Sequence, residues 1–292
     1  GPPGDIRNKI VAERANGLYL QDVFITGMNS HYMVTVPKNW GIPMEPEFIL
    51  PDVKDSNNWF GGKIPFEDER KTILSFLAYP TMNLAVNTEL VKEGEITSFR
   101  DLLDPRWKGK VIINDPQVTG TAFNGFSSFL EYKILDLDYY RQLVKQGPVI
   151  RDSTTQVDWV ARGKYSAIIW PDTNEVRRYQ QAGAPIAWVF PKEGAYMSTD
   201  GSGTVLLDKL PHPNAARIFL NWLLGKEGQR HIQKEMTYHS ARVDVGTEGL
   251  DPLNTRREGV KYIPSANSNR EWLLNEQSKF EAWAKEIFGE AK

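Results

Sequence analysis

The strongest constraint on the fold is an alternation of short apolar runs with helical patterns, which extends from about residue 84 to residue 190. The apolar runs occupy residues 111–113, 149–150, 166–170 and 187–190. The helical patterns between them occupy residues 121–135, 139–145, 155–162 and 175–182. Short strands that alternate with helices are typical of α/β proteins, in which helices cover a mostly parallel sheet. This segment therefore predicts a compact α/β lobe.

A second apolar run, residues 71–87, is interrupted by Tyr79-Pro80. Proline cannot donate a hydrogen bond to a sheet, so a regular central strand cannot pass through this point. We expect two strand halves joined by a kink, as at a crossing between two lobes. The length of 292 residues also favours two lobes over a single core.

The remaining chain predicts a few further elements. Helices are expected at residues 6–15, near 97–103, 214–224, 228–235 and 271–288, strands at 21–26 and 204–207, and a loop at 244–269.

Composition excludes several classes of function. The chain has no cysteine, so disulfides, thiolate metal sites and cysteine nucleophiles are excluded. Its 35 basic and 37 acidic residues leave a formal net charge of −2, which gives no electrostatic footprint for nucleic acid. No apolar run approaches the roughly 18–20 residues of a membrane span, and the first residues form no apolar signal core.

Catalytic and metal-binding motifs have little support in this sequence. The four histidines do not have metal-ligand spacing, and there is no Gly-x-Ser-x-Gly motif. Asp115, Asp172 and Asp200 sit at the ends of predicted strands, so a pair of carboxylates for acid–base chemistry is formally possible. Turn formation beside Pro116 and Pro171 explains Asp115 and Asp172 equally well.

Two other segments indicate binding. Thr119-Gly120-Thr121 follows one strand and precedes a helix, whose free N–H groups could hold an anionic or polar group. Thr119 could instead simply cap that helix. Trp170 ends the SAIIW strand and Asp172 follows it; the indole either offers a stacking face or packs in the core. Because both segments follow strands of one sheet, we expect them to meet at one crevice.

The order of several motifs resembles a known family. DLLDPRWKGK is followed by a strand and Asp-Pro, and later by GKYSAIIWPD, AGAPIAWVFPKEG and HPNAARIFLNWLLGKEGQRHIQKE. Together with GDIRNKIVAERANGLYLQDVF near the start, these segments resemble the extracellular solute-binding proteins of bacterial ABC importers. The likeness is to the type II branch, which includes iron-, thiamine- and polyamine-binding members.

The resemblance implies a two-lobed type II periplasmic binding protein that closes over a small solute and delivers it to ABC permease subunits. The implied lobes are residues 1–83 with 191–292, and residues 84–190, with hinges near 77–87 and 187–194. Ligand contacts would come from loops at the cleft: Gly27, Met28, Tyr79, Thr119, Gly120, Thr121, Trp170, Asp172, Tyr196, Thr199 and Asp200.

Two departures from the family pattern refine this expectation. The strand and helix that usually precede a GDIRNKI-like segment are not in this sequence, which predicts a lobe one without its first strand and helix. The adjacent tyrosines of the ferric-binding branch are replaced by Trp170, Pro171, Asp172 and Thr173. Iron(III) is therefore disfavoured, and a small organic or anionic solute is preferred.

These observations predict a non-enzymatic, monomeric binding protein without cofactor, metal or nucleic-acid partner, located in the periplasm or lipid-anchored outside the cell. The alternatives are an iron(III)- or polyamine-binding member, with Asp172 and Asp200 favouring a cationic amine. A hydrolase using Asp115 and Asp172 and a sensor that signals rather than transports are also alternatives.

Overall fold

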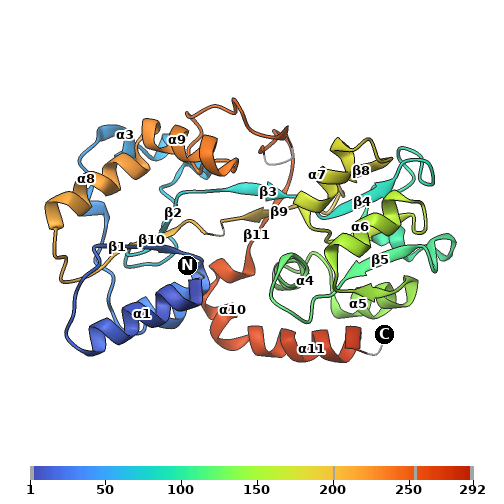
Figure 1. Cartoon of the computed structure of the whole chain (residues 1–292), viewed down its shortest axis with the longest axis horizontal. Helices are drawn as coiled ribbons and strands as arrows, with labels where there is room; N and C mark the ends of the chain where they lie inside the picture. Colours follow the sequence, from blue (N-terminus) through green and yellow to red (C-terminus); the bar gives the residue numbers. More distant parts are fainter. Residues whose placement is uncertain (1–2, 200, 253–254, 290–292) are drawn as a thin grey trace. The chain divides into compact units, whose positions relative to one another are not determined.

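The computed structural model describes residues 3–199, 201–252 and 255–289, and these fall into two compact units (Figure 1). Unit 1 comprises Gly1–Pro80 and Ser198–Arg256, and unit 2 comprises Thr81–Met197 and Arg257–Lys292. The expected first hinge range contains the boundary at Pro80, whereas the expected second hinge range, residues 187–194, ends before Met197. The expected lobe boundaries also differ at the C-terminal end, because Arg257–Lys292 joins unit 2 rather than the first lobe.

Unit 2 is built on a five-stranded sheet of order β6-β5-β7-β4-β8. Its strands are β4 (Leu84–Asn87), β5 (Val111–Asn114), β6 (Val149–Ile150), β7 (Ala167–Ile169) and β8 (Ile186–Val189). β5 pairs in parallel with both β6 and β7, as the alternation of strands and helices predicts, while β4 is antiparallel to β7 and β8.

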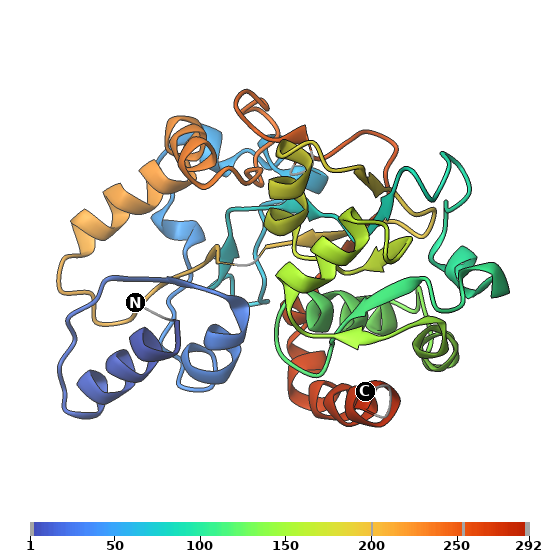
Figure 2. The same ribbon diagram turned by 45° about the vertical axis from the view of Figure 1, so that its right-hand side comes forward.

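Helices cover both faces of this sheet (Figure 2). On one face, Val111 and Ile113 pack with α4 (Thr121–Glu131), α5 (Leu137–Leu143) and α11 (Gln277–Gly289). On the other face, Ile112 packs with α6 (Ser153–Ala161) and α7 (Thr173–Gln181). Alternate residues of one strand thus enter two separate cores, because successive side chains of a strand point to opposite faces.

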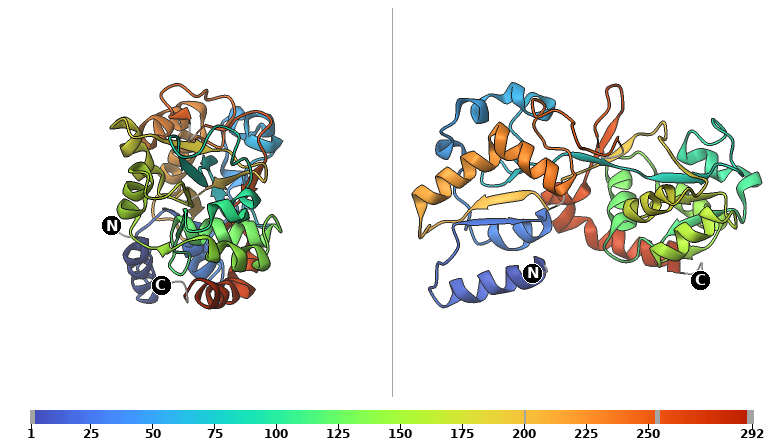
Figure 3. Two further views of the ribbon diagram at one scale, coloured as in Figure 1. Left: turned by 90° about the vertical axis from the view of Figure 1, so that its right-hand side faces the viewer. Right: turned by 45° about the horizontal axis from the view of Figure 1, so that its top comes forward.

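Unit 1 has a smaller sheet of order β1-β10-β2. Its elements are α1 (Pro3–Ala15), β1 (Val23–Thr26), α2 (Met28–Ser30), α3 (Pro51–Lys54), β2 (Leu74–Ser75), β10 (Gly203–Leu206), α8 (Pro213–Leu224) and α9 (Lys226–Met236). Helices α1 and α8 lie on opposite sides of the antiparallel β1–β10 pair (Figure 3).

Three expectations about single elements need correction. The run 71–87 forms three short strands instead of two, and Pro80 lies inside β3 (Tyr79–Thr81), which is tolerated because β3 is an edge strand of the β11-β9-β3 sheet. The expected loop 244–269 contains β11 (Tyr262–Pro264), which pairs in parallel with β9 (Ala195–Ser198). The expected helix 271–288 is divided at Glu276 into α10 (Arg270–Asn275) and α11.

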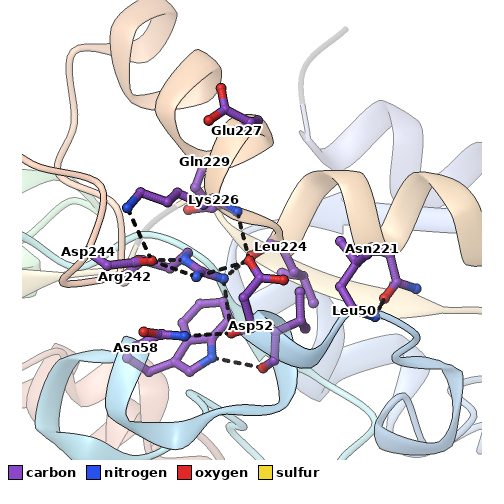
Figure 4. Close-up of polar contacts among 12 residues, drawn as sticks. Leu50, Asp52, Asn58, Asn221, Leu224, Lys226, Glu227, Gln229, Arg242 and Asp244 are labelled. Atoms are coloured by element: carbon purple, nitrogen blue, oxygen red, sulfur yellow. Dashed lines mark hydrogen bonds and ion pairs between the residues drawn. The ribbon is translucent and has the colours of Figure 1, made fainter.

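A buried arginine organises the loop after α9 in unit 1 (Figure 4). The Arg242 side chain is fully buried, and its Nε and Nη2 donate to the two carboxylate oxygens of Asp244 at 2.8 and 2.9 Å. Nη1 donates to the carbonyl oxygen of Leu224 at 3.0 Å, and Nη2 lies 3.2 Å from Oδ2 of Asp52. Hydrogen bonding from Arg242 holds the pKa of Asp244 below its ordinary value. Arg242 therefore ties three separate segments of unit 1 together.

Two buried histidines predict that unit 1 loses stability in acid. Burial lowers the pKa of His31 to about 4, and burial together with Arg256 lowers that of His239 to about 3, from an ordinary value of 6.5. Below pH 6.5 the unfolded chain therefore binds protons that the folded chain does not. The free energy of unfolding should fall between pH 6.5 and 4 by up to about 1.4 kcal/mol per pH unit for each histidine.

Chemical denaturation at a series of pH values checks this dependence. The His31→Gln variant should show a shallower fall than the wild type, whereas His231→Gln, which changes an exposed residue of α9, should keep the wild-type slope. Equal slopes for wild type and His31→Gln would show that His31 does not carry the effect.

Gly125 of α4 is required by packing. A Cβ atom at this position would overlap ring carbons of Trp170, which is fully buried. We expect Gly125→Ala to destabilise the protein by about 1–3 kcal/mol, although alanine is the better helix former. Gly120→Ala is the matched control, since a Cβ there meets no atom within 4 Å. The melting temperatures of both variants are measured by thermal unfolding. Equal melting temperatures for Gly125→Ala and Gly120→Ala would contradict the packing argument.

Candidate functional site

The three parallel strands of unit 2 bring their carboxyl ends to one edge of the sheet. Asp115 follows β5, Arg151 follows β6, and Asp172 comes three residues after the end of β7. Ligands of open α/β sheets bind outside such carboxyl ends. A cavity of about 260 Å³, named here the α4 cavity, lies at this edge. Its lining residues are Asn114, Asp115, Val118, Thr119, Gly120, Thr121, Ala122, Arg151, Ser153 and Asp172.

The α4 cavity confirms the expectation that two of the sequence segments meet. Thr119, Gly120 and Thr121 share it with Asp172, although about fifty residues separate them in the chain. Asn114 holds the two strand ends together, because its amide donates to the carbonyl oxygen of Trp170 at 2.7 Å.

Helix α4 begins at the cavity without a side-chain cap. Its N-cap residue is Gly120, which has no side chain, and no side-chain cap hydrogen bond is present among the described residues. Capping by Thr119 is therefore not observed. The first N–H groups of the helix, with its positive dipole end, are left at the cavity.

Arg151 adds a guanidinium group that the sequence analysis missed. Its Nε and Nη2 donate to Oδ2 of Asp115 at 3.2 and 2.8 Å. The Arg151 side chain is 60% exposed, whereas that of Asp115 is 6% exposed. Two of the five guanidinium N–H donors are used in this way, and the other three have no acceptor among the residues that the structure describes. The available signal was a basic residue directly after the apolar run 149–150.

Both carboxylates of the cavity have structural roles. Asp115 accepts from Arg151 and, through Oδ1, from the N–H of Gln117 at 2.9 Å. Asp172 caps α7, since its Oδ1 accepts from the N–H groups of Asn174 and Glu175 at 2.9 and 3.0 Å. Turn and cap formation thus accounts for both acidic residues.

The expected stacking face of Trp170 is not present, and this expectation needs correction. The Trp170 side chain is fully buried among Phe99, Phe126, Phe129 and Tyr196, with ring centroids 5.1–6.3 Å away. The chain reverses at Trp170 through a left-handed backbone conformation with φ of 58°. This turn directs the indole into the core while Asp172 reaches the cavity.

The other predicted ligand residues lie elsewhere in their units. In unit 1, Met28 is buried, Gly27 precedes α2, Tyr79 stacks on Tyr238 at 4.1 Å, and Thr199 is half-buried. In unit 2, Tyr196 is buried and its hydroxyl donates to Ser265 at 2.8 Å. Asp200 lies outside the described residues.

Two further observations bear on metals and membranes. Within residues 3–199, 201–252 and 255–289, no group of three or more His, Asp or Glu side chains could hold a metal ion. None of the helices in the same ranges is long and apolar enough to cross a membrane.

A larger cavity of about 690 Å³ lies beside the edge strand β8 and the loop 88–97 of unit 2. Its only charged lining residues are Lys92 and Glu93. The α4 cavity is the better candidate because it combines a helix N-terminus, hydroxyl groups and Arg151 at the carboxyl ends of parallel strands.

Comparison with known proteins adds relatives of the same fold. The periplasmic binding protein AfuA from Actinobacillus pleuropneumoniae, solved with fructose-6-phosphate, is 23% identical, with 97% of this chain and 87% of that chain covered and a TM-score of 0.61. Ferric iron-binding protein A from Mannheimia haemolytica is 14% identical, with coverage of 96% and 86% and a TM-score of 0.69. These likenesses confirm the two-lobed α/β fold of periplasmic binding proteins.

A curated relative is an uncharacterised protein from Haemophilus influenzae (strain Rd), 30% identical over 161 residues. The match covers 53% of this chain and 46% of that protein, so the chain spans about half the length of this relative. The model of the bacterial extracellular solute-binding protein family matches residues 21–252, which confirms the resemblance drawn from the sequence motifs. The chain belongs to the bacterial extracellular solute-binding protein family.

Proposed function

We propose that this protein is the solute-binding component of an ABC importer and that the α4 cavity holds the anionic group of a small, hydroxyl-bearing solute. One observation carries this proposal: the uncapped N-terminus of α4 and the guanidinium group of Arg151 line the same cavity. A sugar phosphate is the solute class that fits this arrangement best.

The anionic part of the solute is assigned from the donors. The first N–H groups of α4 and the three remaining N–H groups of Arg151 all require acceptors. Charge-assisted hydrogen bonds from arginine to phosphate or carboxylate are among the strong ones in proteins. Gly120 leaves open space beside this helix end, so a ligand can approach the backbone closely.

The hydroxyl-bearing part is assigned from the acceptor. Oδ2 of Asp172 accepts no hydrogen bond from the residues that the structure describes, whereas Oδ1 is occupied by the cap of α7. A carboxylate beside an anion site suits a ligand that also donates hydroxyl groups. The fructose-6-phosphate bound to AfuA, a protein of the same fold, has this combination. The cavity volume is about 260 Å³. Pockets for drug-sized ligands usually measure about 300–1,000 Å³, so the α4 cavity suits a small solute.

The alternatives receive less support from this geometry. Hydrolysis by Asp115 and Asp172 would need two available carboxylates, yet Asp115 is paired with Arg151 and accepts from Gln117, which leaves only Oδ2 of Asp172. A polyamine would meet the positive end of α4 and a guanidinium group. We therefore propose a non-enzymatic, monomeric protein that acts in the periplasm or lipid-anchored outside the cell and delivers its solute to permease subunits.

Calorimetric titration with a panel of solutes tests the proposal. Hexose phosphates should bind, whereas the parent hexoses, spermidine, thiamine and iron(III) citrate should give no saturable heat. A ligand at 100 times its Kd should also stabilise the protein by about 2.7 kcal/mol. Binding of spermidine or thiamine in place of every phosphorylated sugar would overturn the assignment of an anionic solute.

A further inference from the structure

A separate cavity in unit 1 is surrounded by positive charge. It has a volume of about 160 Å³ and lies between the end of α1, the segment after Thr35 and the turn after β10. We name it the Arg14 cavity. Six of its lining residues carry the argument: Arg14, Tyr19, Lys38, Trp40, Asp208 and Lys209.

The guanidinium group of Arg14 forms a fixed part of this cavity. Its side chain is 2% exposed and is paired with the Asp208 carboxylate, and Nη2 donates to the Asp208 carbonyl oxygen at 2.7 Å. The guanidinium carbon lies 5.2 Å from the ring centre of Tyr19 and 4.7 Å from that of Trp40. The Arg14 Nε is buried and has no acceptor among the described residues. The pair with Asp208 thus neutralises Arg14 without using all of its donors.

Two lysines add further positive charge to this cavity. Lys209 Nζ donates to the hydroxyl of Tyr19 at 2.8 Å and lies 4.2 Å from its ring centre. Lys38 Nζ lies 5.4 Å from the ring centre of Trp40. Neither lysine forms an ion pair within the part of the chain that the structure describes. Three cations and one carboxylate therefore give these six residues a formal charge of +2.

The backbone of Lys209 supports a role for this side chain. Its φ of 55° lies in the left-handed region, which costs a non-glycine residue of order 1 kcal/mol or more. This conformation places the Lys209 ammonium group over Tyr19.

We propose that the Arg14 cavity binds a phosphate-class oxyanion, independently of the α4 cavity. Ammonium groups are strong point-charge binders of phosphate, and the two aromatic rings hold the cations at the cavity. A volume of about 160 Å³ accommodates a phosphate group but not a large organic ligand. The same chemistry is supplied by free inorganic phosphate or by a phosphate group of a lipid surface.

Calorimetric titration with inorganic phosphate tests this site in an Arg151→Ala background, which weakens the anion contacts of the α4 cavity. We expect phosphate binding to persist in this background. Adding the double change Lys38→Met and Lys209→Met should weaken it at least about tenfold. Lys164→Met is the matched control, because Lys164 lies 3.5 Å from the ring centre of Trp159 in unit 2 but lines neither cavity. Equal phosphate affinity with and without Lys38 and Lys209 would overturn the proposal.

Co-sedimentation with phosphatidylcholine vesicles, with and without phosphatidic acid, distinguishes the two sources of phosphate. Binding to phosphatidic acid vesicles that requires Lys38 and Lys209 assigns the site to a lipid surface. Phosphate binding without vesicle binding assigns it to the free ion. If the protein binds neither inorganic phosphate nor phosphatidic acid vesicles, the proposal is overturned.

Discussion

Replacing Arg242 by leucine is expected to lower the free energy of unfolding by about 3–5 kcal/mol. Arg242 is fully buried, and its guanidinium group binds the Asp244 carboxylate, the Asp52 carboxylate and the Leu224 carbonyl oxygen (Figure 4). Leucine would leave these acceptors without their donor in a partly buried site. Breaking a buried ion pair by removing one partner is costly because the remaining charge is no longer compensated.

Denaturation by urea, followed by circular dichroism, measures this loss. Lys226→Leu is the matched control, since Lys226 also approaches Asp244, at 3.8 Å, but is 43% exposed. An exposed pair of this kind contributes about 0–1 kcal/mol. Arg242→Lys should give an intermediate loss, because lysine retains the charge but not the two parallel hydrogen bonds to Asp244. Losses for Arg242→Leu as small as that of Lys226→Leu would contradict the structural role of Arg242.

Replacing Arg151 by alanine is expected to weaken binding of a sugar phosphate by about 2–3 kcal/mol, or roughly 30- to 150-fold. The variant loses the three N–H groups assigned to the anion. It also leaves the buried Asp115 carboxylate without its partner, so a negative charge would face the bound anion. The Arg151 side chain is 60% exposed, and we therefore expect the fold of unit 2 to persist.

Arg162→Ala provides the control for this experiment. Arg162 lies directly after α6, pairs with Asp158 and is 77% exposed, but it does not line the α4 cavity. Calorimetric titration should show unchanged affinity for this variant, and Arg151→Lys should lie between wild type and Arg151→Ala. An Arg151→Ala affinity equal to that of Arg162→Ala would remove Arg151 from the site.

The sequence predicted the parts of the site that depend on local order along the chain. The apolar runs 111–113 and 166–170 predicted strands with a shared direction, and parallel strands place their ends at one edge. Thr119, Gly120 and Asp172 were therefore expected at one crevice, and the structure places them there. Whether they bind the solute remains a prediction that the titrations address.

The sequence could not assign the aromatic residues. An apolar strand such as SAIIW does not indicate whether its last residue, Trp170, turns outward or inward. The left-handed backbone of Trp170, the absence of a side chain on Gly125 and the neighbouring Phe99 decide this together. Tyr196, which the resemblance implied as a ligand contact, packs against Trp170 from a distant segment, and such a contact has no signal in the local sequence.

Local pattern by itself determined the α/β class, the succession of strands and helices and the position of α4, because hydrogen bonding and apolar periodicity act over a few residues. Tertiary structure alone decided three other features. It paired Arg151 with Asp115, it joined Arg257–Lys292 to unit 2, and it surrounded Arg242 with acceptors from segments up to 190 residues apart. Each of these depends on side chains or strands that meet only after the chain has folded, and periodicity carries no information about such contacts.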